Sequence, residues 1–108
     1  MVDGIVKQTL ETLGPPVSRL YYKGTEDTYI TFQLALGARS IFADDECLGK
    51  EYIYRADIFS KTDYISLREN MIIALEELGC YEITIDPEYY ENATGFYHVP
   101  ITFKILEV

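Results

Sequence analysis

The stretch that decides the fold runs from Ser60 to Gly79 and reads SKTDYISLRENMIIALEELG. Its apolar residues recur at steps of three and four, which is the spacing of one helix face. Cap-forming residues precede this run, and Gly79 is a typical helix stop. Further apolar residues widen the stripe, so we expect a core helix that lies across a sheet with one flank also covered. The stripe consists of Tyr64, Leu67, Met71, Leu75 and Leu78, widened by Ile65, Ile72, Ile73, Ala74 and Cys80.

Segments with the two-residue period of β-strands lie on both sides of this helix. Residues 28–36 and 51–59 alternate before it, and residues 81–85 and 96–106 alternate after it. The first of these strands is expected to place Ile30, Phe32, Leu34 and Leu36 on one face. The last two segments predict a closing hairpin with a long polar connection over residues 88–95. Pro100 lacks an N–H group and therefore indicates a sheet edge or a bulge.

The N-terminal half predicts a helix over residues 3–13, which Gly14-Pro15-Pro16 would end, and a short strand over residues 17–22. Residues 37–49 show no single period, so we expect a long and partly extended excursion, mobile in the free subunit. Its inner part, residues 38–43, could extend the preceding strand as an arm.

These elements predict an α+β fold in which two helices pack on one face of an antiparallel sheet. A chain of 108 residues with 48% hydrophobic residues fills one core, so we expect a single domain over residues 1–108. The N-terminus lacks the pattern of a signal peptide, and no segment is long and apolar enough for a membrane span. Cys47 and Cys80 are far apart in sequence, and we expect two reduced thiols.

Charge and residue spacing argue against most chemical functions. Nine basic and eighteen acidic residues give a net charge of −9, which disfavours nucleic acid as a ligand. His98 is the only histidine, and its place in the alternation predicts a solvent-side or edge position. Asp44, Asp45 and Glu46 are consecutive and lack the spacing of a calcium loop, which favours a solvated acidic loop. We therefore expect no catalytic residue, no metal and no cofactor, and an enzyme is the weakest hypothesis.

Surface chemistry favours protein contacts instead. Ten tyrosines exceed the needs of a small core, and tyrosine suits both interfaces and half-buried strands. Arg55 and Asp57 lie two apart on one strand face, as an ordinary charge pair or as a contact between subunits. If copies of the chain form a ring through which DNA passes, the three consecutive acids line its lumen and repel DNA; the alternative is that they keep the outer surface soluble. The candidate interface residues are Ile41, Phe42, Asp44, Asp45, Glu46, Arg55, Asp57, Tyr89 and Tyr90.

Three segments together resemble the tail-completion, or tail-terminator, proteins of bacteriophages and of phage-derived contractile particles in Gram-positive bacteria. They are Tyr29-Ile30-Thr31-Phe32, the run YRADIFSK over residues 54–61 and the run ENATGFYH over residues 91–98. The resemblance implies a non-enzymatic subunit that forms a hexameric ring on the last ring of the tail tube and stops tail growth.

Its implied partners are copies of itself, the tail tube protein and a head-completion or connector protein. The implied location is the virion tail or a phage-like particle, assembled in the bacterial cytoplasm. Head-tail connection and tail tube proteins have similar length and content, so the station in the particle stays open. The alternative is a monomeric or dimeric module that binds a peptide at the edge containing Pro100 or in a cleft beside the core helix.

Overall fold

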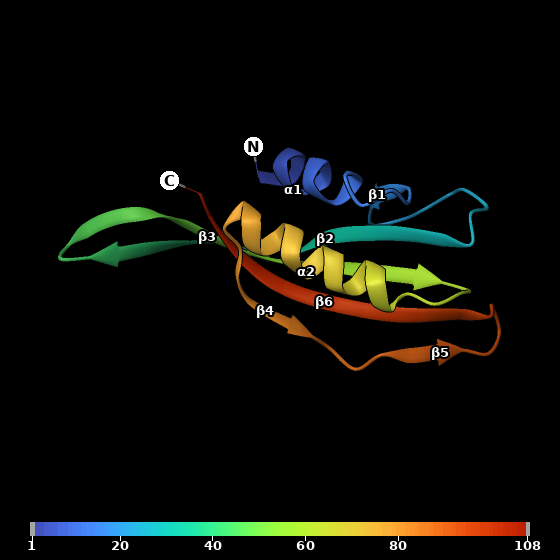
Figure 1. Cartoon of the computed structure of the whole chain (residues 1–108). Coiled ribbons are helices and arrows are strands. Elements are labelled where there is room, and N and C mark those ends of the chain that lie inside the picture. The colour runs from blue at the N-terminus through green and yellow to red at the C-terminus, as the bar shows by residue number, and fades with distance from the viewer. Residues whose placement is uncertain (1, 108) are drawn as a thin grey trace.

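The computed structural model describes residues 2–107, which form two helices and six strands (Figure 1). The elements are α1 (Val2–Glu11), β1 (Val17–Arg19), β2 (Thr28–Ala43), β3 (Glu46–Ser60), α2 (Ile65–Leu78), β4 (Tyr81–Ile85), β5 (Tyr89–Glu91) and β6 (Phe96–Glu107). The six strands form one sheet in the order β1-β2-β3-β6-β4, and β5 pairs with β6 beyond the end of β4. The predicted α+β fold is confirmed.

One strand runs against expectation, because β1 pairs with β2 in parallel while every other pair is antiparallel. Val17 lies opposite Ile30, so the connection over residues 20–27 carries the chain back to the end of the sheet where β1 began. The turn-forming residues of this connection predict a turn but not the direction of the strand that follows it. The predicted antiparallel sheet therefore has one parallel strand, at this edge.

Both helices cover the same face of the sheet (Figure 1). Helix α2 is the helix predicted from residues 60–79, and Gly79 ends it in the left-handed conformation at φ 102°. Met71 and Leu75 are fully buried against the sheet, whereas Ile65 and Ile73, which were expected to widen the stripe, are exposed. Helix α1 contacts α2, as the expected cover on one flank requires. The apolar sides of both helices and of the sheet form one core, made of Val2, Val6, Leu10, Ile30, Phe32, Tyr54, Ala56, Ile58, Met71, Leu75, Cys80, Val99, Ile101, Phe103 and Ile105.

Strands β2 and β3 form a hairpin that projects beyond the body of the molecule (Figure 1). Residues 37–49, predicted as an excursion without a regular pattern, are continuous strand around a turn at Asp44 and Asp45. The prediction that the inner part extends the preceding strand is confirmed. A register shift between Leu34 and Leu36 explains the missing pattern, because an extra residue in one strand turns the following side chains to the opposite face. Leu36 lies opposite Ile53 and not on the core face predicted for it.

Strand β6 lies inside the sheet, so Pro100 is not on an edge strand, but it faces the gap where neither β4 nor β5 pairs with β6. The carbonyl of Pro100 accepts a hydrogen bond of 2.9 Å from the amide of Asp86, immediately after β4 ends. The nitrogen of Pro100 points to the same side of β6 as this carbonyl, where the chain between β4 and β5 leaves the sheet. Proline therefore costs no bond to β3. The predicted polar connection over residues 88–95 also contains a strand, β5.

Candidate functional site

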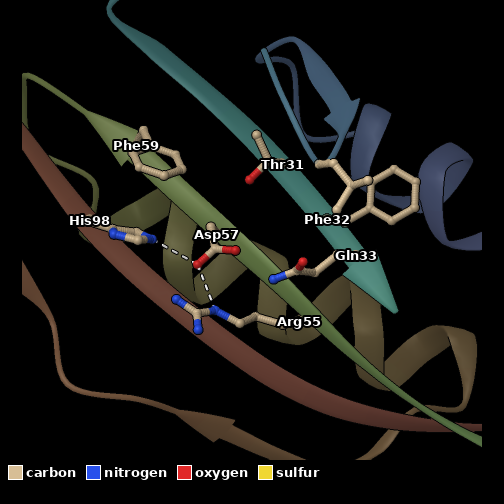
Figure 2. A pocket seen from close by; sticks show the side chains of 8 residues that line it. Thr31, Phe32, Gln33, Arg55, Asp57, Phe59 and His98 are labelled. Carbon is tan, nitrogen blue, oxygen red and sulfur yellow. Dashed lines mark hydrogen bonds and ion pairs between the residues drawn. The ribbon is translucent and has the colours of Figure 1, made fainter. Parts of the chain in front are cut away.

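A row of polar side chains crosses the face of the sheet that the helices leave uncovered, here called the far face (Figure 2). Arg55 Nε donates a hydrogen bond of 2.9 Å to Asp57 Oδ1, and Nε2 of His98 lies 2.8 Å from the same oxygen. A carboxylate only accepts, so Nε2 carries the proton and Nδ1 accepts from the hydroxyl of Tyr89. Three strands, β3, β6 and β5, are joined by this row.

His98 is buried, which corrects the prediction of a solvent-side or edge position. Its ring stacks on Phe59 at a centroid distance of 4.2 Å, and the ring of Tyr89 meets it edge-on at 4.7 Å. The alternation correctly placed His98 opposite the core face. Phe59 of β3 and Tyr89 of β5 then cover its ring. Alternation along one strand does not predict contacts with neighbouring strands.

A cavity of about 230 Å³ opens beside this row, and we call it the far-face pocket. Thr31 and Gln33 of β2 lie across from Asp57 and Arg55 of β3, and Leu20 stands at its rim. Thr31 is 8% exposed and Asp57 6% exposed. Within residues 2–107, no hydrogen bond is made by the Thr31 hydroxyl, the Gln33 amide or the two terminal nitrogens of Arg55. Figure 2 shows Thr31 and Gln33 on the β2 side of Asp57, while the guanidinium of Arg55 extends toward β6.

The projecting part of the β2–β3 hairpin is the second candidate site, and we call residues 39–49 the arm. Strand β6 ends at Glu107, opposite Lys50, so the arm has two strands where the body has more. Phe42 is 64% exposed, and Leu48 is also exposed. Asp44, Asp45 and Glu46, here called the acidic tip, are exposed and form no ion pair among the described residues. The arm thus offers apolar and acidic groups to a partner.

A buried carboxylate fastens the base of the arm to the body. Glu51 accepts hydrogen bonds of 2.7 Å from Arg39 and 2.5 Å from the hydroxyl of Tyr81 in β4. The bond from Tyr81 lowers the pKa of Glu51 most, burial opposes it, and Lys104 and Arg39 lower it further. Burial, followed by the bond to Glu51, raises the pKa of Tyr81 to about 12. These groups hold the first residues of the arm in one orientation.

A tyrosine cluster lies at the opposite end of the sheet from the arm. Tyr89 and Tyr90 of β5 are both half exposed. The ring of Tyr90 lies 5.0 Å from that of Tyr97, which lies 5.6 Å from that of Tyr64 ahead of α2. These contacts leave polar tips and ring edges at the surface, as tyrosines in protein interfaces do.

The predicted interface residues therefore fall into separate groups. Arg55, Asp57 and Tyr89 meet in one network, whereas Tyr90 joins the tyrosine cluster. The predicted residues of the arm, Ile41, Phe42, Asp44, Asp45 and Glu46, lie together at the far end of the hairpin.

Sequence reasoning missed the other members of these sites, which are Thr31, Gln33, Glu51, Tyr81 and His98. The polar side of the predicted strand over residues 28–36 was a signal for Thr31 and Gln33. Their alignment with Asp57 and Arg55 depends on strand register, which the sequence does not show.

Comparisons with known proteins give matches among solved structures only. No protein-family model and no curated protein matches the chain. A solved structure of the virion of the native gene transfer agent (GTA) particle contains a chain that is 12% identical, with a TM-score of 0.49. The match covers 92% of this chain and 88% of that one. A similarity of this degree assigns no function, so the proposals below rest on the residues and their geometry. Over residues 2–107, no helix has the length and apolar character that crossing a membrane requires.

Proposed function

We propose that this chain is a non-enzymatic structural subunit of the tail of a phage or phage-like particle. Copies of it would form a ring, expected to be hexameric, that ends the tail tube and joins it to the head side. The three sequence segments that resemble tail-completion proteins support this proposal, as does the small α+β domain that the resemblance implies. Its partners would be its own copies, the tail tube protein and a head-completion or connector protein, all within the particle.

The observation that carries the proposal is the exposed arm. An isolated two-stranded hairpin is marginally stable in water, and it gains stability from a third strand or from packing. Phe42 and Leu48 expose apolar surface on this hairpin. The outer edge of β2 beyond Phe32, where its pairing with β1 ends, carries unpaired backbone groups. Contact with a neighbouring subunit would cover both.

The shape of the molecule suits a ring. Its extents are 51 × 24 × 22 Å, with the arm at one end of the long axis (Figure 1). An arm that reaches a different surface of the next copy makes a head-to-tail contact, and such contacts close into rings when the rotation fits. The tyrosine cluster at the other end of the sheet provides a further contact surface.

An arm-shortened variant tests this function. Residues 41–49 are replaced by Asn-Gly, which joins the paired residues Ser40 and Lys50 by a two-residue turn. Native mass spectrometry and negative-stain electron microscopy at high protein concentration should show rings of the full chain and monomers of the variant. Cys47→Ser, an exposed change within the arm, serves as the control and should leave the rings intact.

Two results would contradict the proposal. A full chain that stays monomeric at high concentration, alone and with the tail tube protein, would favour the alternative of a small protein- or peptide-binding module. Rings of unchanged size from the arm-shortened variant would show that the arm plays no part in assembly. Peptide binding at Pro100 is not the form this alternative takes, because Pro100 lies inside the sheet.

A further inference from the structure

We propose that the far-face pocket of one copy binds the acidic tip of the arm of a second copy. This inference rests on the self-assembly proposed above and names the two surfaces that meet. Every subunit would give its acidic tip to one neighbour and receive the tip of the other, so the same contact repeats around the assembly.

The free polar groups of the pocket match a carboxylate. Both terminal nitrogens of Arg55 are available, and a guanidinium binds a carboxylate with two parallel hydrogen bonds. Gln33 and Thr31 add an amide and a hydroxyl donor on the neighbouring strand. Oδ1 of Asp57 is already occupied by Arg55 Nε and by His98. The donors that remain therefore outnumber the free acceptors in this space.

The polar groups that line the pocket keep hydrogen-bonding capacity for an occupant. The Thr31 side chain belongs to a residue that is 92% removed from solvent, yet its hydroxyl has no partner among residues 2–107. This hydroxyl is therefore free to donate to a ligand that enters the pocket. Figure 2 shows this hydroxyl and the Gln33 amide on the same side of the sheet as Asp57 and Arg55. An incoming carboxylate would satisfy them together.

The acidic tip is the part of this chain best placed to supply that carboxylate to another copy. Its three acids form no ion pair within the described residues, whereas six of the nine basic side chains do. The arm carries the tip away from its own sheet, so it cannot fold back onto its own far-face pocket (Figure 1). The acidic tip of one copy can reach the far-face pocket of a second copy.

Apolar residues flank both partners of the proposed contact. Phe42 precedes the acidic tip, and Leu20 stands exposed at the rim of the pocket. Phe59 forms another part of the pocket wall. Packing of Phe42 on this rim would exclude water from the ion pair, which strengthens it.

The test uses one variant of each surface and a matched control. The tip variant, Asp44→Asn/Asp45→Asn/Glu46→Gln, removes three charges, and asparagine tolerates the positive φ of 51° and 62° at the turn. The pocket variant, Gln33→Glu, places a carboxylate opposite Arg55 and fills the pocket from within. Glu11→Gln/Glu76→Gln/Glu77→Gln removes the same number of charges at exposed helix positions and serves as the control.

Sedimentation velocity over a concentration series measures the association constant of each variant. The tip and pocket variants should each associate about 30-fold or more weakly than the wild type, as expected when one partner of a desolvated ion pair is lost. The control should associate like the wild type. An equimolar mixture of the tip and pocket variants keeps one intact pocket and one intact tip. It should form a heterodimer of wild-type affinity and nothing larger.

Several results would overturn the inference. Wild-type rings together with normal assembly of the tip variant would refute this contact and leave the proposed ring function standing. A mixture that forms no heterodimer would refute the pairing of these two surfaces. If Gln33→Glu does not fold, Arg55→Gln replaces it as the pocket variant in the same measurements. Loss of assembly in the pocket variant alone would assign the pocket to a different occupant. A wild-type chain that is monomeric at every concentration would refute both this contact and the ring.

Discussion

Leu75→Ala tests whether α2 and the sheet share a single core. Leu75 is 0% exposed and lies on the buried side of α2 with Met71. The substitution removes three carbon groups, which corresponds to about 2.4 kcal/mol at about 0.8 kcal/mol per buried group. The cavity that remains adds to this loss, so we expect a decrease of about 3–4 kcal/mol in the free energy of unfolding.

Urea denaturation followed by far-ultraviolet circular dichroism measures this loss. The experiment needs a protein concentration at which the chain is monomeric, because self-association adds to apparent stability. The slope of the free energy against urea should be unchanged, so that the difference lies in the midpoint. Ile73→Ala is the matched control on the same helix, since Ile73 is 52% exposed. It should change the free energy of unfolding by about 0.5 kcal/mol or less.

The difference between the two variants shows whether α2 and the sheet share a single core. A loss below about 1 kcal/mol for Leu75→Ala would mean that α2 does not seal the core as described. Equal losses for the two variants would mean that the helix is rotated about its axis relative to the sheet.

Three further predictions concern the arm, its base and the thiols. Amides of residues 41–49 should exchange hydrogen rapidly in the dilute chain and slowly in the assembly, and slow exchange in the monomer would contradict a partner-dependent arm. Tyr81→Phe should raise the pKa of Glu51 in an NMR titration, because it removes the largest cause of the lowered value. Since a lowered folded-state pKa gives stability that is lost as pH falls through it, this variant should lose less stability on acidification; an unchanged Glu51 pKa would refute the role of Tyr81. Alkylation at neutral pH should modify exposed Cys47 quickly and Cys80 only on unfolding, because burial raises the pKa of Cys80 to about 11; equal rates in the native chain would contradict this burial.

Local periodicity determined much of the secondary structure from the sequence alone. The stripe at three- and four-residue steps identified α2, and Gly79 marked its end. Alternation identified the strands and correctly placed Ile30 and Phe32 on the core face of β2. Such patterns are reliable because they depend on the geometry of a single element.

Register and strand direction were decided by the tertiary structure. One shifted residue in β2 turned Leu36 to the far face, and a return of the chain made β1 parallel. A parallel edge strand and a register shift depend on bonds to a second strand, so a pattern within one strand does not contain them.

The candidate sites were likewise determined partly by the sequence and partly by the tertiary structure. The sequence by itself indicated Arg55 and Asp57 as a charge pair and the arm as a contact segment. Pairing of β3 with β6 then brought His98 to Asp57, although the two residues are 41 positions apart. It also buried a histidine that alternation assigned to solvent. Residue types and local spacing thus determined which side chains were available, while the free energy of packing between distant strands decided which of them meet.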